Sequence, residues 1–117
     1  MLSVPAGTQI YLALGAVDMR RGFDGLSLYV QEVLGRDPYG GHLFLFRGKR
    51  GDRLKILYAD GNGLCLFAKR LDKGCFLWPR LAAQNGVMIL TPGQLGYLLE
   101  GLDWRAPERV GRPASVG

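Results

Sequence analysis

The chain has 117 residues, of which 48% are hydrophobic and 21% charged, and this length suits one domain with one hydrophobic core. The balance excludes a globally disordered chain, and no apolar run approaches the ~18 residues of a membrane span. The formal net charge of +5 raises the question of a polyanionic partner.

The N-terminus has neither the charged segment nor the apolar core of a signal peptide. Two cysteines are too few for a four-ligand zinc site or for a secreted disulfide scaffold. We therefore expect a cytoplasmic protein with reduced thiols and no membrane partner. A single domain should span residues 1–105, and the Arg-, Pro- and Gly-rich stretch 106–117 should be a flexible basic tail.

The first third of the chain predicts one strand and one helix. A short apolar run over residues 9–14 lies between turn residues and predicts a strand. Apolar side chains at helical spacing then predict a helix over 18–34, capped at its start by Asp18. Gly35 follows, and glycine commonly supplies the left-handed position that ends a helix.

The middle of the chain predicts consecutive hairpins, because short apolar runs alternate with Gly-rich turns. The Asp-Gly-Asn-Gly sequence at 60–63 is the strongest hairpin signal, since such pairs tolerate the positive φ of tight turns. The runs that predict strands are 42–47, 53–58, 64–71, 75–78 and 87–90.

A second helix should follow the last strand. Thr91 can cap it, Pro92 suits the first helical position, and Gln94 completes a capping box. Its apolar stripe consists of Leu95, Leu98, Leu99 and Leu102. The expected fold class is α+β: a mainly antiparallel sheet of about five to six short strands, packed by one helix in the N-terminal half and one C-terminal helix.

The positive charge is concentrated in the predicted hairpins. Residues 47–80 hold nine of the fifteen basic side chains but three of the ten acidic ones. Such a local excess attracts polyanions, although an Arg- and Lys-rich hairpin is also compatible with an ordinary solvated surface. The candidate nucleic-acid-binding residues are Arg47, Lys49, Arg50, Arg53, Lys55, Lys69 and Arg70.

Symmetric turns would fix which side chains share a face of the sheet. A turn centred at 61–62 places Arg53 opposite Arg70, and a turn centred at 49–50 places Phe46 opposite Arg53 and Phe44 opposite Lys55. Basic groups beside exposed aromatic rings are typical of single-strand nucleic-acid platforms, unless another element or a partner subunit buries the two phenylalanines. The opposite face is expected to be the core beneath the helices and carries Leu43, Leu45, Leu54, Ile56, Tyr58 and Phe67, with Lys69 near an end.

Nothing in the sequence favours an enzyme, a cofactor or a metal. The chain has no Gly-x-Ser-x-Gly, Walker A, Gly-x-Gly-x-x-Gly or His-Glu-x-x-His motif, and its one histidine, His42, is expected to be structural. Cys65 and Cys75 are expected to be small apolar core residues rather than redox partners. A magnesium-dependent nuclease is the least favoured function; its candidate ligands are Asp18, Asp24, Asp52, Asp60 and Asp72.

Several separated motifs occur in an order that points to a known family. They lie at 18–26, 42–47, 51–58, 60–63, 69–71, 74–79, 90–92, 94–95 and 102–104. Across residues 8–105 the chain resembles the small TnpB accessory protein of the IS66 group of bacterial insertion sequences, which is distinct from the larger RNA-guided nuclease of the same name. The resemblance implies a part in transposition beside a separate large transposase, and it implies no catalytic residue. Ala59 departs from the family pattern, which commonly has Trp there, so any contact made by that aromatic is in doubt.

Two functions follow from the charge and the resemblance together. One is a non-catalytic accessory factor in transposition that binds DNA through the basic hairpins. The alternative is an adaptor that docks on the transposase without touching DNA, through Phe44, Phe46 and Trp78, since aromatic residues concentrate at interface centres. Both can hold at once, and the oligomeric state stays open.

Overall fold

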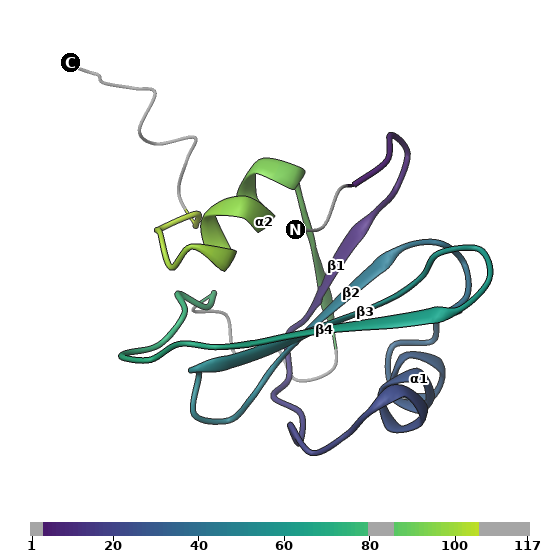
Figure 1. The fold of residues 1–117 in the computed structure, drawn as a ribbon, viewed down its shortest axis with the longest axis horizontal. Coiled ribbons are helices and arrows are strands. Elements are labelled where there is room, and N and C mark those ends of the chain that lie inside the picture. The colour runs from purple at the N-terminus through teal and green to yellow at the C-terminus, as the bar shows by residue number, and fades with distance from the viewer. Residues whose placement is uncertain (1–3, 80–85, 106–117) are drawn as a thin grey trace.

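The computed structural model describes residues 4–79 and 86–105, and in these it contains five strands and two helices (Figure 1). The expected α+β class is confirmed, while the stretch 106–117 lies outside the described residues. In chain order the elements are β1 (Ile10–Ala13), α1 (Phe23–Glu32), β2 (Leu43–Arg47), β3 (Arg53–Ala59), β4 (Leu64–Arg70), β5 (Val87–Leu90) and α2 (Pro92–Leu99).

The sheet has the strand order β4-β3-β2-β1-β5. The antiparallel hairpins β2–β3 and β3–β4 agree with the sequence. The pairing of β1 does not follow from hairpins, because β1 lies parallel to β2 and is connected to it through α1. On its other side β1 pairs antiparallel with the distant β5. The strand expected at 75–78 does not form.

Helices cover both faces of the sheet, α1 on one side and α2 on the other (Figure 1). The expectation of one core beneath both helices is therefore wrong. Phe44 and Phe46, which are 1% and 0% exposed, pack under α1 with Leu26 and Val30. They are buried by a helix of their own chain and present no exposed stacking surface.

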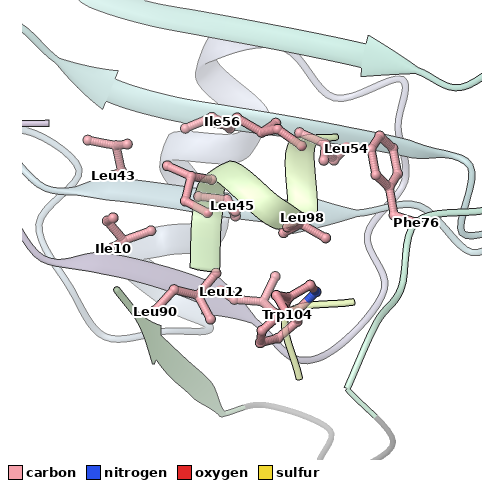
Figure 2. Close-up of a cluster of buried hydrophobic side chains, with 12 residues drawn as sticks. Ile10, Leu12, Leu43, Leu45, Leu54, Ile56, Phe76, Leu90, Leu98 and Trp104 are labelled. Atoms are coloured by element: carbon pink, nitrogen blue, oxygen red, sulfur yellow. The ribbon is translucent and has the colours of Figure 1, made fainter. Parts of the chain in front are cut away.

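The face beneath α2 forms the second core (Figure 2). Leu98 lies over Leu45 and Leu54, and the ring of Trp104 closes the cluster beside Leu12. Every residue expected on this face from the turn geometry lies in this cluster or packs against it, apart from Lys69. Burial of such side chains stabilises a fold by ~1.5–3 kcal/mol each, so both faces contribute to stability.

The two hairpins differ in how well the sequence predicts their register. In β3–β4, Arg53 lies opposite Arg70, as expected. In β2–β3 the register is two residues away from the prediction, with Phe46 opposite Lys55 and Phe44 opposite Leu57. The turn is centred on Arg50 and Gly51, and Gly51 has a φ of 84° that glycine adopts readily. Because the shift is even, every side chain keeps its expected face.

The start of α1 corrects a second expectation. The helix begins at Phe23 after Gly22, which provides no side-chain cap. Asp18 instead forms a tight turn with Arg20, whose backbone N–H and guanidinium both donate to the carboxylate. The helix ends at Glu32, two residues before the expected end. Gly35 adopts the expected left-handed conformation at a φ of 65°, and the Arg36 N–H donates to the Val30 carbonyl at 3.0 Å.

The start of α2 agrees with the sequence, and its end does not. Thr91 and Gln94 form the capping box, with both hydrogen bonds present. Leu102, expected in the apolar stripe, is exposed because Gly101 turns the chain away at a φ of 77°. Trp104 enters the core in its place.

Candidate nucleic-acid interface

Four of the seven candidate basic residues gather at one end of the sheet. Lys49 and Arg50 lie in the β2–β3 turn, Arg53 begins β3, and Arg70 ends β4 directly opposite Arg53. All four side chains are exposed, and none makes an ion pair or a side-chain hydrogen bond within residues 4–79 and 86–105. We call this set of four residues the basic end.

Two adjoining hollows, which share Met19 and Arg53, mark the basic end. One, of about 470 Å³, is bordered by Lys49, Arg50, Asp18 and Asp52. The other, of about 490 Å³, is bordered by Lys55, Lys69, Arg70 and Asp72. The carboxylate of Asp18 is already paired with Arg20. The hollows thus retain a positive excess, which is the condition for attracting an anion.

The other three candidates donate to backbone carbonyl groups. Lys55 Nζ lies 2.8 Å from the Arg21 oxygen, beside the second hollow. Arg47 donates to the Leu14 oxygen at 3.2 and 3.3 Å, at the end of β1. Lys69 Nζ lies 2.6 Å from the oxygen of Leu99, the last residue of α2, on the opposite face. The structure therefore brings Lys55 to the basic end and separates Arg47 from it, whereas Lys69 borders the second hollow but directs its ammonium group to α2.

The segment 75–78 holds in place the β2–β3 turn that carries Lys49 and Arg50, which we call the basic turn. The Phe76 N–H and the Trp78 Nε1–H both donate to the Gly51 oxygen, at 2.9 and 3.0 Å, and Cys75 Sγ lies 3.3 Å from the Arg50 oxygen. A Cβ on Gly51 would lie 3.4 Å from Cys75 Sγ and from Trp78 Nε1, so the fit is close. We call this segment the brace.

The brace is itself tied to the C-terminal part of the domain. Trp104 Nε1 donates to the Leu77 oxygen at 2.6 Å, and Arg105 Nη1 to the Trp78 oxygen at 3.4 Å. Trp104 is buried against α2 and the sheet (Figure 2). A chain of hydrogen bonds therefore connects the core beneath α2 with the tip of the basic turn.

Sequence reasoning missed this supporting role of Cys75 and Trp78, and it missed Met19, which lines both hollows. All three residues lie in motifs on which the family resemblance rests. The sequence therefore marked these positions, but it did not indicate what their side chains contact. The expectation that the cysteines are core residues is wrong. Cys75 is exposed, and Cys65 is half-buried beside Asp60. Partial burial raises the pKa of the Cys65 thiol, which disfavours the reactive thiolate.

Two other expected features bear on catalysis. His42 Nδ1 accepts a hydrogen bond from the Gln9 N–H at 3.0 Å, and its ring packs edge-on against Tyr11, which is a structural role. Among the described residues no group of three or more His, Cys, Asp or Glu side chains is arranged to hold a metal ion.

In that same part of the chain, no helix has the length and apolarity needed to cross a membrane.

The departure at Ala59 lies away from the basic end. Ala59 is the last residue of β3 and Arg53 the first, so the two are about 20 Å apart along the strand. A contact made by an aromatic residue at this position would concern the other end of the hairpin.

Comparison with known proteins identifies the family. The family model described as IS66 Orf2 like protein matches residues 8–109. Two proteins of Sinorhizobium fredii (strain NBRC 101917 / NGR234), named uncharacterized protein y4hO and uncharacterized protein y4jC, are 49% and 40% identical to this chain, over 100% and 99% of both lengths. No solved structure matches the chain significantly. The chain therefore belongs to the IS66 Orf2-like family, a family of accessory proteins associated with transposition and not known for catalysis.

Proposed function

We propose that the protein is a non-catalytic accessory factor that binds DNA through the basic end during transposition of its insertion sequence. The observation that carries this proposal is the gathering of Lys49, Arg50, Arg53 and Arg70, exposed and unpaired in the described chain, around two hollows. Each is a donor suited to phosphate oxygens. The family supplies the biological setting.

The form of the surface favours contact with the sugar-phosphate backbone over reading of bases. Its donors are flexible cations in a turn and at strand ends, and such contacts position a protein without carrying sequence information. Phe44 and Phe46 lie buried beneath α1, so these two rings, which the sequence offered as a stacking platform, are not accessible to bases. Duplex DNA is therefore the expected ligand.

The test is a titration of duplex DNA across a salt range with wild type and two charge-matched variants. Affinity should fall steeply with salt, because each neutralised phosphate releases about 0.9 counterion. Arg50→Glu should weaken binding at least tenfold. Arg36→Glu makes the same change in charge, but Arg36 lies over the Tyr11 ring, near the start of β2 and away from the basic turn, so it should have little effect.

Two results would reject the proposal. One is a duplex affinity that changes less than threefold between low and moderate salt. The other is an equal loss of affinity in Arg50→Glu and Arg36→Glu, since a general effect of net charge would then account for all binding.

A second candidate, docking on the transposase without DNA contact, is favoured by apolar side chains on α1. Phe23 and Leu28 of α1 are each 48% exposed, and Val33, the C-cap of the helix, is 39% exposed. They replace Phe44 and Phe46 as the exposed apolar side chains that an adaptor would use. Co-purification of the transposase from DNA-free extracts, lost in Leu28→Glu and kept in Arg50→Glu, would support this function. Absence of a complex at micromolar concentrations would count against it.

A further inference from the structure

Arg53 and Arg70 face each other across the β3–β4 pair, on the same side of the sheet. In the neighbouring pair, the Leu71 backbone N–H donates a hydrogen bond to the backbone carbonyl oxygen of Asp52 at 2.9 Å. Hydrogen-bonded and non-hydrogen-bonded pairs alternate in an antiparallel ladder, so Arg53 and Arg70 form a non-hydrogen-bonded pair with Cα atoms about 4.5 Å apart. This is the closer of the two arrangements.

Two like charges in this position destabilise a sheet unless something neutralises them. Neither guanidinium is paired with a carboxylate in the part of the chain that the structure describes. Both border the 490 Å³ hollow, which Ala68 helps to form and Asp72 borders on one side. Two further cations, Lys55 held by the Arg21 carbonyl and Lys69 held by the Leu99 carbonyl, also line this hollow.

We propose that Arg53 and Arg70 together form the seat for one phosphodiester group of a polynucleotide, an inference that rests on the proposed function and deepens it. A guanidinium donates two parallel hydrogen bonds to a phosphate. Two such groups, starting from adjacent strands, approach one anion from two sides. Lys49 and Arg50, in the turn, then contact a different phosphate of the same strand.

The first experiment compares how duplex affinity depends on salt in wild type, Arg53→Gln, Arg70→Gln and the double variant. Each single change should weaken binding about two- to fivefold and leave the salt slope almost unchanged, because the remaining arginine still neutralises the phosphate. The double variant should lower the slope by about 0.9. If each single variant lowers the slope by about 0.9 and the double variant by about 1.8, the residues bind separate phosphates and the proposal is wrong.

The second experiment measures the seat without DNA, by thermal unfolding in sodium phosphate and in sodium chloride of equal ionic strength. Phosphate should raise the Tm of wild type, raise it further in Asp72→Asn, and leave the double variant unaffected. Without phosphate the single variants should be at least as stable as wild type, because they relieve the repulsion. This result also establishes that they fold.

The two experiments separate the seat from the wider function. If phosphate stabilises wild type but not the double variant, and no DNA binds, the phosphate site is supported and the proposed function is rejected. The opposite outcome is that DNA binds with the same salt slope in wild type and the double variant, and that phosphate stabilises both equally. The phosphate site is then rejected and the proposed function is supported.

Discussion

Lys69 and Arg70 are consecutive residues of β4, yet they have opposite roles because side chains alternate between the faces of a strand. Arg70 is exposed beside Arg53, whereas Lys69 reaches the carbonyl at the end of α2. A cation at the C-terminus of a helix satisfies a carbonyl that has no partner within the helix and complements the helix dipole. Net charge therefore overstates the size of the proposed DNA-binding surface unless each side chain is traced to its partner.

Replacement of Lys69 by Met should separate stability from DNA binding. Loss of the 2.6 Å bond to Leu99 should lower the free energy of unfolding by about 1 kcal/mol, and duplex affinity should change less than twofold. Urea unfolding and a DNA titration measure the two effects, with Lys73→Met, an exposed residue of the neighbouring turn, as the control. An affinity loss as large as that of Arg70→Gln would place Lys69 in the interface.

Asp18 provides a test of the electrostatics beside the first hollow. The Arg20 guanidinium, and then its backbone N–H, donate to the carboxylate and hold the pKa of Asp18 well below its ordinary value of 3.8. Because the folded pKa is lower than the unfolded one, the stabilisation is complete above the unfolded value. It is lost as pH falls from there through the folded pKa.

An NMR titration of the Asp18 side chain should therefore show it still mostly ionised at pH 3.8. In Arg20→Gln the midpoint of Asp18 should move up toward the ordinary value. An unshifted wild-type midpoint would show that the pair with Arg20 does not form in solution.

At the level of secondary-structure elements, the brace makes the β2–β3 turn a fixed feature of the fold. Its contacts use the carbonyl oxygens of Arg50 and Gly51 as acceptors. The side chains of Lys49 and Arg50 take no part in these contacts and stay available to bind a ligand. A turn held this way loses less conformational freedom when it binds a ligand. The brace should therefore affect DNA affinity without touching DNA.

Trp78→Phe tests this role because it keeps an aromatic ring and removes the Nε1–H donor to Gly51. We expect a loss of about 1 kcal/mol of stability, faster amide exchange in the turn, and a several-fold weaker affinity for duplex DNA with an unchanged salt slope. Tyr97→Phe, at an exposed position on α2, is the matched control. A reduced salt slope in Trp78→Phe would mean that the tryptophan contacts the nucleic acid itself.

The sequence predicts elements and faces well where the determinants are local. The Asp-Gly-Asn-Gly turn sets the β3–β4 register, and the Thr91 capping box sets the start of α2. The β2–β3 register was missed because its centre depends on the positive φ of Gly51, which the brace supports from 24 residues away or more. The parallel β1–β2 pairing and the burial of Phe46 under α1 were missed for the same reason, since they depend on contacts between distant segments.

On the scale of the whole molecule, the single sheet joins two cores that do not touch one another directly. Phe46 belongs to the cluster beneath α1, whereas Trp104 belongs to the one beneath α2 and Trp78 packs against it. Every strand from β1 to β3 contributes side chains to both clusters, so loss of either should unpair the strands that the other needs. We therefore expect one cooperative unfolding transition.

Phe46→Ala makes this expectation measurable, because both tryptophans report from outside the core that the substitution damages. Removal of a fully buried phenylalanine should cost about 3–5 kcal/mol. Tryptophan fluorescence and far-UV circular dichroism should shift together to the same lower urea midpoint. Leu98→Ala, on the opposite face, should behave in the same way with a cost of about 2–5 kcal/mol. A fluorescence transition that keeps its wild-type midpoint in Phe46→Ala, while the dichroism transition moves, would show that the two cores unfold independently and that the basic end, tied through Trp104 to the core beneath α2, survives the loss of α1.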